Sequence, residues 1–299
     1  MSAILRAQAL GKRYGRRQAL AECTLDIPPG HVVGLVGPNG AGKTTLLKIA
    51  CGVLTPTTGR IEVLGGQPAT GPAQLARIGY VAQDTPTYAN LSVADHLKLG
   101  AKLNPHWDAA LAQARIGQLG LDPKQKAGKL SGGQRAQLTL TVAVAKRPEL
   151  LVLDEPVASL DPLARRGFLR HLMESVAENE TSVILSSHLV SDLERVCDYL
   201  IVLVSARVQL AGETEDLLAQ HHRIVCTRRS ESDLPAGLAV VWAEHTERQS
   251  TFIVRSEADV PAGDWSVEGL ALEDLVLTYM ERAADPGYRP AALTAGGAR

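Results

Sequence analysis

The segment GPNGAGKTT at positions 37–45 lies between an apolar run suited to a buried strand, Val32–Val36, and a helical run, residues 43–51. Its members are Gly37, Pro38, Asn39, Gly40, Ala41, Gly42, Lys43, Thr44 and Thr45. It fits the pattern GxxxxGK[ST] in the strand-to-helix context of a phosphate-binding loop. Glycines there let backbone N–H groups face phosphate oxygens, and the helix start favours negative charge. We predict that Lys43 reaches nucleotide phosphates and Thr44 holds Mg²⁺. A plain glycine-rich turn is the alternative for this segment alone.

Two adjacent carboxylates, Asp154 and Glu155, follow the apolar strand predicted at Leu150–Asp154. The carboxyl end of such a strand reaches the sheet edge where α/β proteins bind ligands. We expect Asp154 to join the Mg²⁺ shell and Glu155 to be the general base, or to orient the attacking water. For the dipeptide alone, acidic capping of the helix after Pro156 explains the residues equally well.

A second glycine-rich segment, residues 130–135, starts a long helical run. Ser131, Gly132, Gly133 and Gln134 form a helix start that suits an anion, but the segment has no lysine to complete a phosphate cradle. By itself it predicts half of a binding site. An ordinary helix N-cap is the alternative.

Three single residues gain meaning only beside these segments. Gln83 follows a strand predicted at residues 79–82, and His188 follows one predicted at residues 182–186. Both would reach the same sheet edge as the two carboxylates, although an isolated His or Gln is more often a satisfied structural side chain. Tyr14 offers a π face to an adenine ring, and packing is its alternative role.

Taken in order, these segments together with Asp161 in the SLD sequence at 159–161 resemble the complete motif set of the ATP-binding-cassette (ABC) ATPases, over about residues 4–222. The LSGGQ sequence that starts at Leu130 is nearly confined to that family. The resemblance implies a P-loop ATPase that binds ATP and Mg²⁺ between two subunits closed head to tail. The second subunit would be another copy of this chain or a paralogue, and both sites of a homodimer would hydrolyse ATP.

The resemblance also implies roles for individual residues. Ser131 and Gly133 would complete the γ-phosphate pocket of the partner subunit, which accounts for the half-site above. Gln83 would sense Mg²⁺ and the γ-phosphate, and His188 would hold the γ-phosphate and orient the water. Asp161 would link the two composite sites across the interface.

The expected fold class is α/β: a P-loop NTPase with a mixed-sheet core, an antiparallel β subdomain, a helical subdomain and a small C-terminal α+β appendage. Strands are predicted at residues 4–10, 20–27, 32–36, 60–64, 79–82, 150–154, 182–186 and 199–204, and in the appendage at 223–228, 238–244 and 251–256. Helices are predicted near residues 92–102, 108–119 and 270–282. The predicted domains are an ATP-binding domain at 1–222, with its helical part at about 84–148, the appendage at 223–284 and a flexible tail at 285–299.

The composition of the chain limits the classes of partner that it can bind. The 299 residues are 45% hydrophobic and 21% charged, which suits a chain with a full core. The net charge of −1, from 31 basic and 32 acidic residues, argues against a surface built for nucleic acid. We see no secretory signal and no apolar run of the roughly 18 residues that a membrane helix needs. The scattered cysteines, Cys23, Cys51, Cys197 and Cys226, indicate reduced thiols in the cytosol.

Within the ABC family, a transporter subunit that works with separate membrane-spanning permeases is the leading interpretation. In the family such partners dock near residues 84–98, so we expect the chain on the inner face of the cell membrane. Residues 90–93 and 105–108 and the short appendage look like the ATPases of ABC-2-type bacterial exporters. A soluble ABC ATPase that acts on ribosomes or DNA is the alternative. A GTPase would carry an NKxD or TKxD motif, which this sequence lacks.

Overall fold

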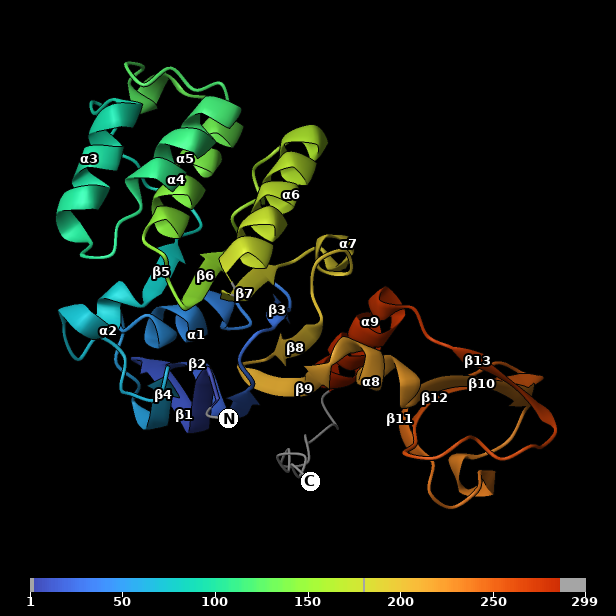
Figure 1. Cartoon of the computed structure of the whole chain (residues 1–299). Helices are drawn as coiled ribbons and strands as arrows, with labels where there is room; N and C mark the ends of the chain where they lie inside the picture. The colour runs from blue at the N-terminus through green and yellow to red at the C-terminus, as the bar shows by residue number, and fades with distance from the viewer. Residues whose placement is uncertain (1–2, 180, 286–299) are drawn as a thin grey trace.

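The computed structural model describes residues 3–179 and 181–285, so the tail predicted at 285–299 lies outside the described residues except for Asp285. Its centre is a six-stranded sheet with the order β5-β6-β7-β3-β8-β9 (Figure 1). The strands are β3 (Val32–Val36), β5 (Ile78–Val81), β6 (Leu150–Asp154), β7 (Ser182–Ser187), β8 (Tyr199–Val204) and β9 (Arg207–Glu213). All pair in parallel except β9, which is antiparallel to β8.

The parallel strands β3, β6 and β7 are buried at every position, as their continuous apolar runs predict for a sheet covered on both faces. Their carboxyl ends meet at one edge of the sheet. The phosphate-loop segment after β3, the carboxylates at the end of β6 and His188 after β7 therefore converge there.

A second, antiparallel sheet has the order β2-β1-β4 and confirms the antiparallel subdomain. Its strands are β1 (Leu5–Tyr14), β2 (Arg17–Ile27) and β4 (Thr58–Val63). Helix α1 (Lys43–Ala50) contacts this sheet and the central sheet, and its apolar residues Leu46, Leu47 and Ile49 share one core with both. This packing fixes the start of α1 beside the β1–β2 hairpin.

Helices and loops form the insertion predicted after Gln83. They are α3 (Val93–Leu103), α4 (Ala109–Gln118), the short η1 (Ala127–Lys129) and α5 (Gly132–Ala145). Ser92 caps α3 through a reciprocal pair of hydrogen bonds with Asp95. Gly120 ends the α4 region with φ +62°, a backbone conformation that favours glycine. In Figure 1 these helices stand together on one side of the central sheet.

The remaining helices surround the central sheet and its connection to the C-terminal part. They are α2 (Pro72–Ala76), α6 (Pro162–Asn179), α7 (Val190–Leu193), α8 (Thr214–Ala219) and α9 (Leu272–Ala284). Within the described residues, no helix is both long and apolar enough to cross a membrane.

The C-terminal part contains an antiparallel sheet with the order β11-β12-β10-β13. Its strands are β10 (His221–Thr227), β11 (Ala239–His245), β12 (Gln249–Arg255) and β13 (Trp265–Gly269), with a short η2 (Glu231–Asp233) between β10 and β11. From this sheet, α9 returns to the central sheet, where Leu275 and Val276 join the core that contains Leu200 of β8. The domain division at 222 stays a prediction; β10 runs across that position.

Two strands, β9 and β13, are absent from the sequence prediction. The turn before β9 is formed by Ser205 and Ala206, with φ values of +49° and +67°. Such a hairpin turn usually contains Asn or Gly, so this sequence gives no turn signal. Strand β13 is exposed at four of its five positions and therefore lacks the alternating apolar pattern of a half-buried strand.

Candidate nucleotide-binding site

The phosphate loop connects β3 to α1, as predicted. A side chain at Gly37 would place its Cβ 2.0 Å from the carbonyl oxygen of Leu203. At Gly42, where φ is +113°, the Cβ would lie 2.4 Å from the carbonyl oxygen of Ala19. Both positions therefore require glycine, because only glycine lets the loop pack this closely and adopt this backbone. The result is a tight loop with its backbone available to a ligand.

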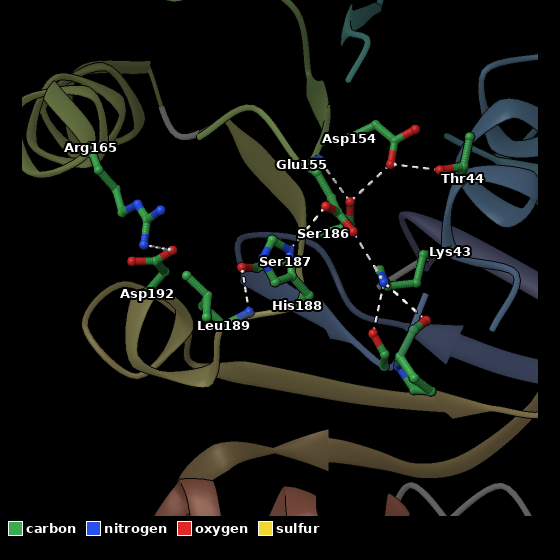
Figure 2. Close-up of polar contacts among 12 residues, drawn as sticks. Lys43, Thr44, Asp154, Glu155, Arg165, Ser186, Ser187, His188, Leu189 and Asp192 are labelled. Atoms are coloured by element: carbon green, nitrogen blue, oxygen red, sulfur yellow. Dashed lines mark hydrogen bonds and ion pairs between the residues drawn. The ribbon is translucent and has the colours of Figure 1, made fainter. Parts of the chain in front are cut away.

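Lys43 begins α1, and its side chain is 5% exposed. Its Nζ donates to the carbonyl oxygens of Gly37 at 2.7 Å and Pro38 at 3.3 Å. The same Nζ forms an ion pair with Glu155 Oε1 at 3.1 Å (Figure 2). The cation thus lies inside the loop and beside the carboxylate that follows β6.

Glu155 connects the phosphate loop to the end of β7. Its second oxygen, Oε2, lies 3.0 Å from Nδ1 of His188 (Figure 2). The carboxylate is 9% exposed, whereas the His188 side chain is 40% exposed. The backbone of Glu155 has φ +46°, a strained conformation for a residue with a side chain. Lys43, Glu155 and His188 therefore form one continuous chain of charged and polar contacts.

Asp154, the last residue of β6, is 1% exposed. Its Oδ1 accepts hydrogen bonds from Thr44 Oγ1 at 3.1 Å and Ser186 Oγ at 3.0 Å. Burial raises the pKa of this carboxyl, and the two hydrogen bonds oppose that rise. Within the described residues, the buried Oδ2 has no hydrogen-bond partner. A carboxylate with one satisfied and one free buried oxygen, next to a threonine hydroxyl, fits a divalent cation with oxygen ligands.

Ser186 is a site residue that the sequence analysis missed. Its hydroxyl donates to Asp154 Oδ1 and accepts the backbone N–H of Glu155 at 2.9 Å. Ser186 is fully buried, so it links both acidic residues to β7 and stabilises the strained backbone of Glu155. The signal in the sequence was a polar residue at the end of an apolar strand, immediately before Ser187 and His188.

An open cleft lies over the phosphate loop and brings most of the predicted site residues together. Tyr14 from the end of β1 and Gln83 from the loop after β5 both line it. In the part of the chain that the structure describes, the lining consists of Tyr14, Arg17, Ala19, Asn39, Gly40, Ala41, Gly42, Lys43, Thr44, Thr45, Gln83 and Glu155. Tyr14 is 46% exposed, so its ring is accessible to a planar ligand. His188 does not line the cleft and reaches it through Glu155.

The LSGGQ segment lies outside this cleft. Ser131 caps α5: its Oγ accepts the N–H of Gln134, and the Gln134 side chain accepts the N–H of Ser131. Ser131 and Gly132 are exposed, and Gly133 and Gln134 are half-buried. The predicted N-cap is therefore observed, and the role of these residues as half of a binding site stays a prediction. Their hydrogen bonds are made locally, and they contribute nothing to the cleft of their own chain.

Asp161 is exposed and caps α6. Its Oδ1 accepts the backbone N–H groups of Leu163 and Ala164, both at 3.0 Å. Like Ser131, it does not line the cleft. Its role between two subunits stays a prediction.

Comparisons with known proteins agree with this geometry. The ABC transporter family model matches residues 20–158. The chain is 32% identical over 212 residues to the lantibiotic transport ATP-binding protein SrtF of Streptococcus pyogenes, covering 70% of this chain and 91% of SrtF. It is 31% identical over 224 residues to the Nod factor export ATP-binding protein I of Cupriavidus metallidurans, covering 73% and 74% of the two chains.

Among solved structures, the ATP-binding subunit of an ABC transporter superposes with a TM-score of 0.64 at 27% identity, over 72% of this chain and 92% of that one. The region matched by the family model, residues 20–158, includes the phosphate loop, the LSGGQ segment, and β6 with the Glu155 that follows it. The P-loop α/β fold with its antiparallel and helical parts is therefore confirmed. This chain belongs to the family of ABC transporter ATP-binding proteins.

Proposed function

We propose that this chain binds and hydrolyses ATP as one of two ATP-binding subunits that drive separate permease subunits, in an exporter of the ABC-2 type. The observation that carries the proposal is the contact chain of Lys43, Glu155 and His188 at the wall of the phosphate-loop cleft. Lys43 and Glu155 are each less than a tenth exposed, and the backbone of Glu155 is strained. A buried ion pair on a strained backbone beside an open cleft is typical of a functional site rather than of a purely structural contact.

ATP binding would use the groups that line the cleft. The adenine ring would stack on Tyr14, and the phosphates would lie on the backbone N–H groups of the loop and the start of α1. Lys43 would then exchange its contacts with loop carbonyls and Glu155 for phosphate oxygens. This exchange would free the Glu155 carboxylate for its second role.

In hydrolysis, a water oxygen attacks the γ-phosphorus, the bond to the bridging oxygen breaks, and ADP and phosphate leave. Glu155 would orient the water and take its proton, and the left-handed backbone at Glu155 holds the carboxylate at the cleft. His188, in contact with Glu155 Oε2, would hold the γ-phosphate from the β7 side. Gln83, which reaches the cleft from the loop after β5, would contact the same phosphate group.

Mg²⁺ would be held by Thr44 Oγ1 and Asp154, with Gln83 next to it. The free Oδ2 of Asp154 and the raised pKa of its buried carboxyl support this assignment, because a cation would favour the charged form. When bound, the metal would neutralise charge on the phosphates.

The second subunit would supply the residues that the cleft lacks. Ser131, Gly132, Gly133 and Gln134 are accessible at the start of α5 but lie outside the cleft of their own chain. We infer that they contact the γ-phosphate bound by a partner and that Asp161 lies at the same interface. The partner would be a second copy or a paralogue.

The transport function rests on the relatives, which are named for transport of a lantibiotic and export of a Nod factor. These names favour a permease-coupled ATPase over one that acts on ribosomes or DNA. The chain would then work at the inner face of the cell membrane through its permease partners. The nature of the cargo would be set by those partners.

The test is ATP binding and turnover by the full chain and by Lys43→Ala. We expect Lys43→Ala to lose measurable ATP affinity and turnover, because the buried cation would contact the phosphates directly. Lys102→Ala, which removes the same charge from the exposed end of α3, serves as the matched control. Equal ATP affinity for wild type and Lys43→Ala would overturn the proposed site.

A further inference from the structure

Among the described residues, Arg17 is the one cleft-lining cation to which the motif set assigns no role. It begins β2 and is paired across the hairpin with Tyr14, the last residue of β1. Both side chains line the cleft over the phosphate loop. Arg17 therefore occupies the side of the site that faces the hairpin, whereas Lys43 lies on the side of Glu155.

The guanidinium of Arg17 lies against the phosphate loop. Its Nη2 is 3.3 Å from the point where a Cβ on Gly40 would lie. Gly40 has φ +81° and itself lines the cleft. The carbonyl oxygen of Ala19 packs directly against Gly42, so the hairpin and the phosphate loop are in close contact at this position. An arginine at this place can reach a ligand on the loop without any rearrangement of the backbone.

The charges in the cleft leave Arg17 available. Among the lining residues, Arg17, Lys43 and Glu155 carry ionised side chains. Lys43 and Glu155 form an ion pair, so much of the charge on Lys43 is already balanced. Across residues 3–179 and 181–285, the Arg17 side chain forms no ion pair or hydrogen bond. Among the described residues that line the cleft, Arg17 is therefore the one charged side chain without a partner, and the expected ligand carries several negative charges.

We propose that Arg17 is a second phosphate-binding cation of this site, which contacts the phosphate groups of the nucleotide from the hairpin side. The proposal rests on the function proposed above and adds a residue to it. A guanidinium suits this task because its planar set of donors can contact two phosphate oxygens at once. Arg17 would thus strengthen binding of nucleoside di- and triphosphates and contribute little to binding of the nucleoside.

The test compares Arg17→Ala with Arg16→Ala in the full chain. Arg16 is the neighbouring exposed arginine in the same hairpin, and it does not line the cleft, so both variants lose one positive charge from the same turn. Affinity is measured by displacement of a fluorescent ATP analogue with ATP, ADP or adenosine. We expect Arg17→Ala to bind ATP about tenfold more weakly and Arg16→Ala to change affinity less than about twofold.

Three further measurements distinguish direct contact between Arg17 and the phosphates from indirect effects of the substitution on the site. Arg17→Lys should recover part of the ATP affinity, since lysine keeps the positive charge but lacks the planar set of donors of the guanidinium. The difference between wild type and Arg17→Ala should shrink as ionic strength rises. Displacement by millimolar adenosine should be the same for wild type and Arg17→Ala. An equal loss of affinity for adenosine would mean that Arg17 acts through Tyr14, and would overturn the proposal.

The two proposals fail in different ways. If Lys43→Ala loses ATP binding while Arg17→Ala and Arg16→Ala bind alike, the nucleotide site stands and the role of Arg17 is wrong. If wild type itself does not bind ATP, the proposed function is wrong. Thermal unfolding without nucleotide shows whether each variant is folded, and Arg17→Lys provides the measurement if Arg17→Ala is not.

Discussion

Two regions of the molecule bury polar groups for different purposes. At the edge of the central sheet, Asp154 leaves one buried oxygen without a partner, and Glu155 adopts a strained backbone. At the junction with the C-terminal sheet, His221 is fully buried and both of its ring nitrogens are satisfied. Unsatisfied and strained groups cost stability, and at the cleft they face the place where a ligand would bind, whereas the satisfied pair at the junction connects two parts of the fold.

At this junction, the contact between His221 and Tyr279 is made by neutral groups, beside the ion pair of Arg223 on β10 with Asp274 on α9. His221 Nδ1 lies 2.6 Å from the carbonyl oxygen of Leu217, which can only accept, so Nδ1 donates. Nε2 then accepts from the hydroxyl of Tyr279 on α9 at 2.9 Å. This pair attaches α9 to the first strand of the C-terminal sheet. Variants at the cleft should therefore change turnover, and variants at the junction should change stability.

The largest effect is expected for Glu155→Gln. This substitution keeps the size of the side chain but removes the base, so turnover should fall about 10²- to 10⁴-fold while ATP affinity is retained. Single-turnover hydrolysis and equilibrium binding measure the two quantities separately. Glu149→Gln, on the exposed ion pair with Arg77, is the matched control and should keep its turnover. Wild-type turnover by Glu155→Gln would remove Glu155 from the reaction.

The junction should show its effect in the pH dependence of stability. Burial lowers the pKa of His221 from 6.5 to about 4, so the folded state resists the proton that the unfolded state accepts. The contribution of His221 is complete above pH 6.5 and is lost as pH falls toward 4. The loss should be about 3 kcal/mol at most.

Denaturant unfolding at a series of pH values measures this loss. His221→Asn should reduce the change in the free energy of unfolding between pH 6.5 and about 4. His222→Asn, on the same strand but only partly buried, should leave this pH dependence as in wild type. ATP turnover at neutral pH should change little in both. An unchanged slope in His221→Asn would show that another group controls acid sensitivity.

Ser186→Ala should cause a smaller loss of turnover than Glu155→Gln. It removes a hydrogen bond to Asp154 and leaves the backbone N–H of Glu155 without its acceptor. We expect turnover to fall about tenfold with a nearly unchanged KM for ATP, since the phosphate loop is intact.

Ser182→Ala is the control for Ser186→Ala. Ser182 is buried at the opposite end of β7, where its hydroxyl accepts the N–H of Gly30. This variant should lose stability without a loss of turnover. If the two variants lose stability alike and neither loses turnover, Ser186 has only a structural role. The buried polar groups at the cleft would then act on stability, as those at the junction do.

The sequence predicted the cleft better than the junction. Gly37, Lys43, Asp154 and Glu155 lie in contiguous segments, and parallel strands bring their ends together by topology alone. Ser186 and Arg17 required side-chain geometry, because a serine in a strand and an arginine in a hairpin have many ordinary roles. The same holds for His221, whose partner Tyr279 is distant in sequence and whose burial depends on how α9 returns. The strand β9 was missed because its turn, Ser205-Ala206, carries no glycine or asparagine.

In the proposed dimer, each ATP would be bound by the loop of one subunit and the LSGGQ segment of the other. The most direct test mixes Lys43→Ala with Ser131→Arg, each of which should be inactive alone. In a mixed pair, the Ser131→Arg subunit keeps its loop and meets the intact LSGGQ segment of the Lys43→Ala subunit. Random pairing should restore about a quarter of wild-type turnover, since half of the dimers would carry one working site of two. Turnover no greater than the sum of the separate variants would contradict the shared site.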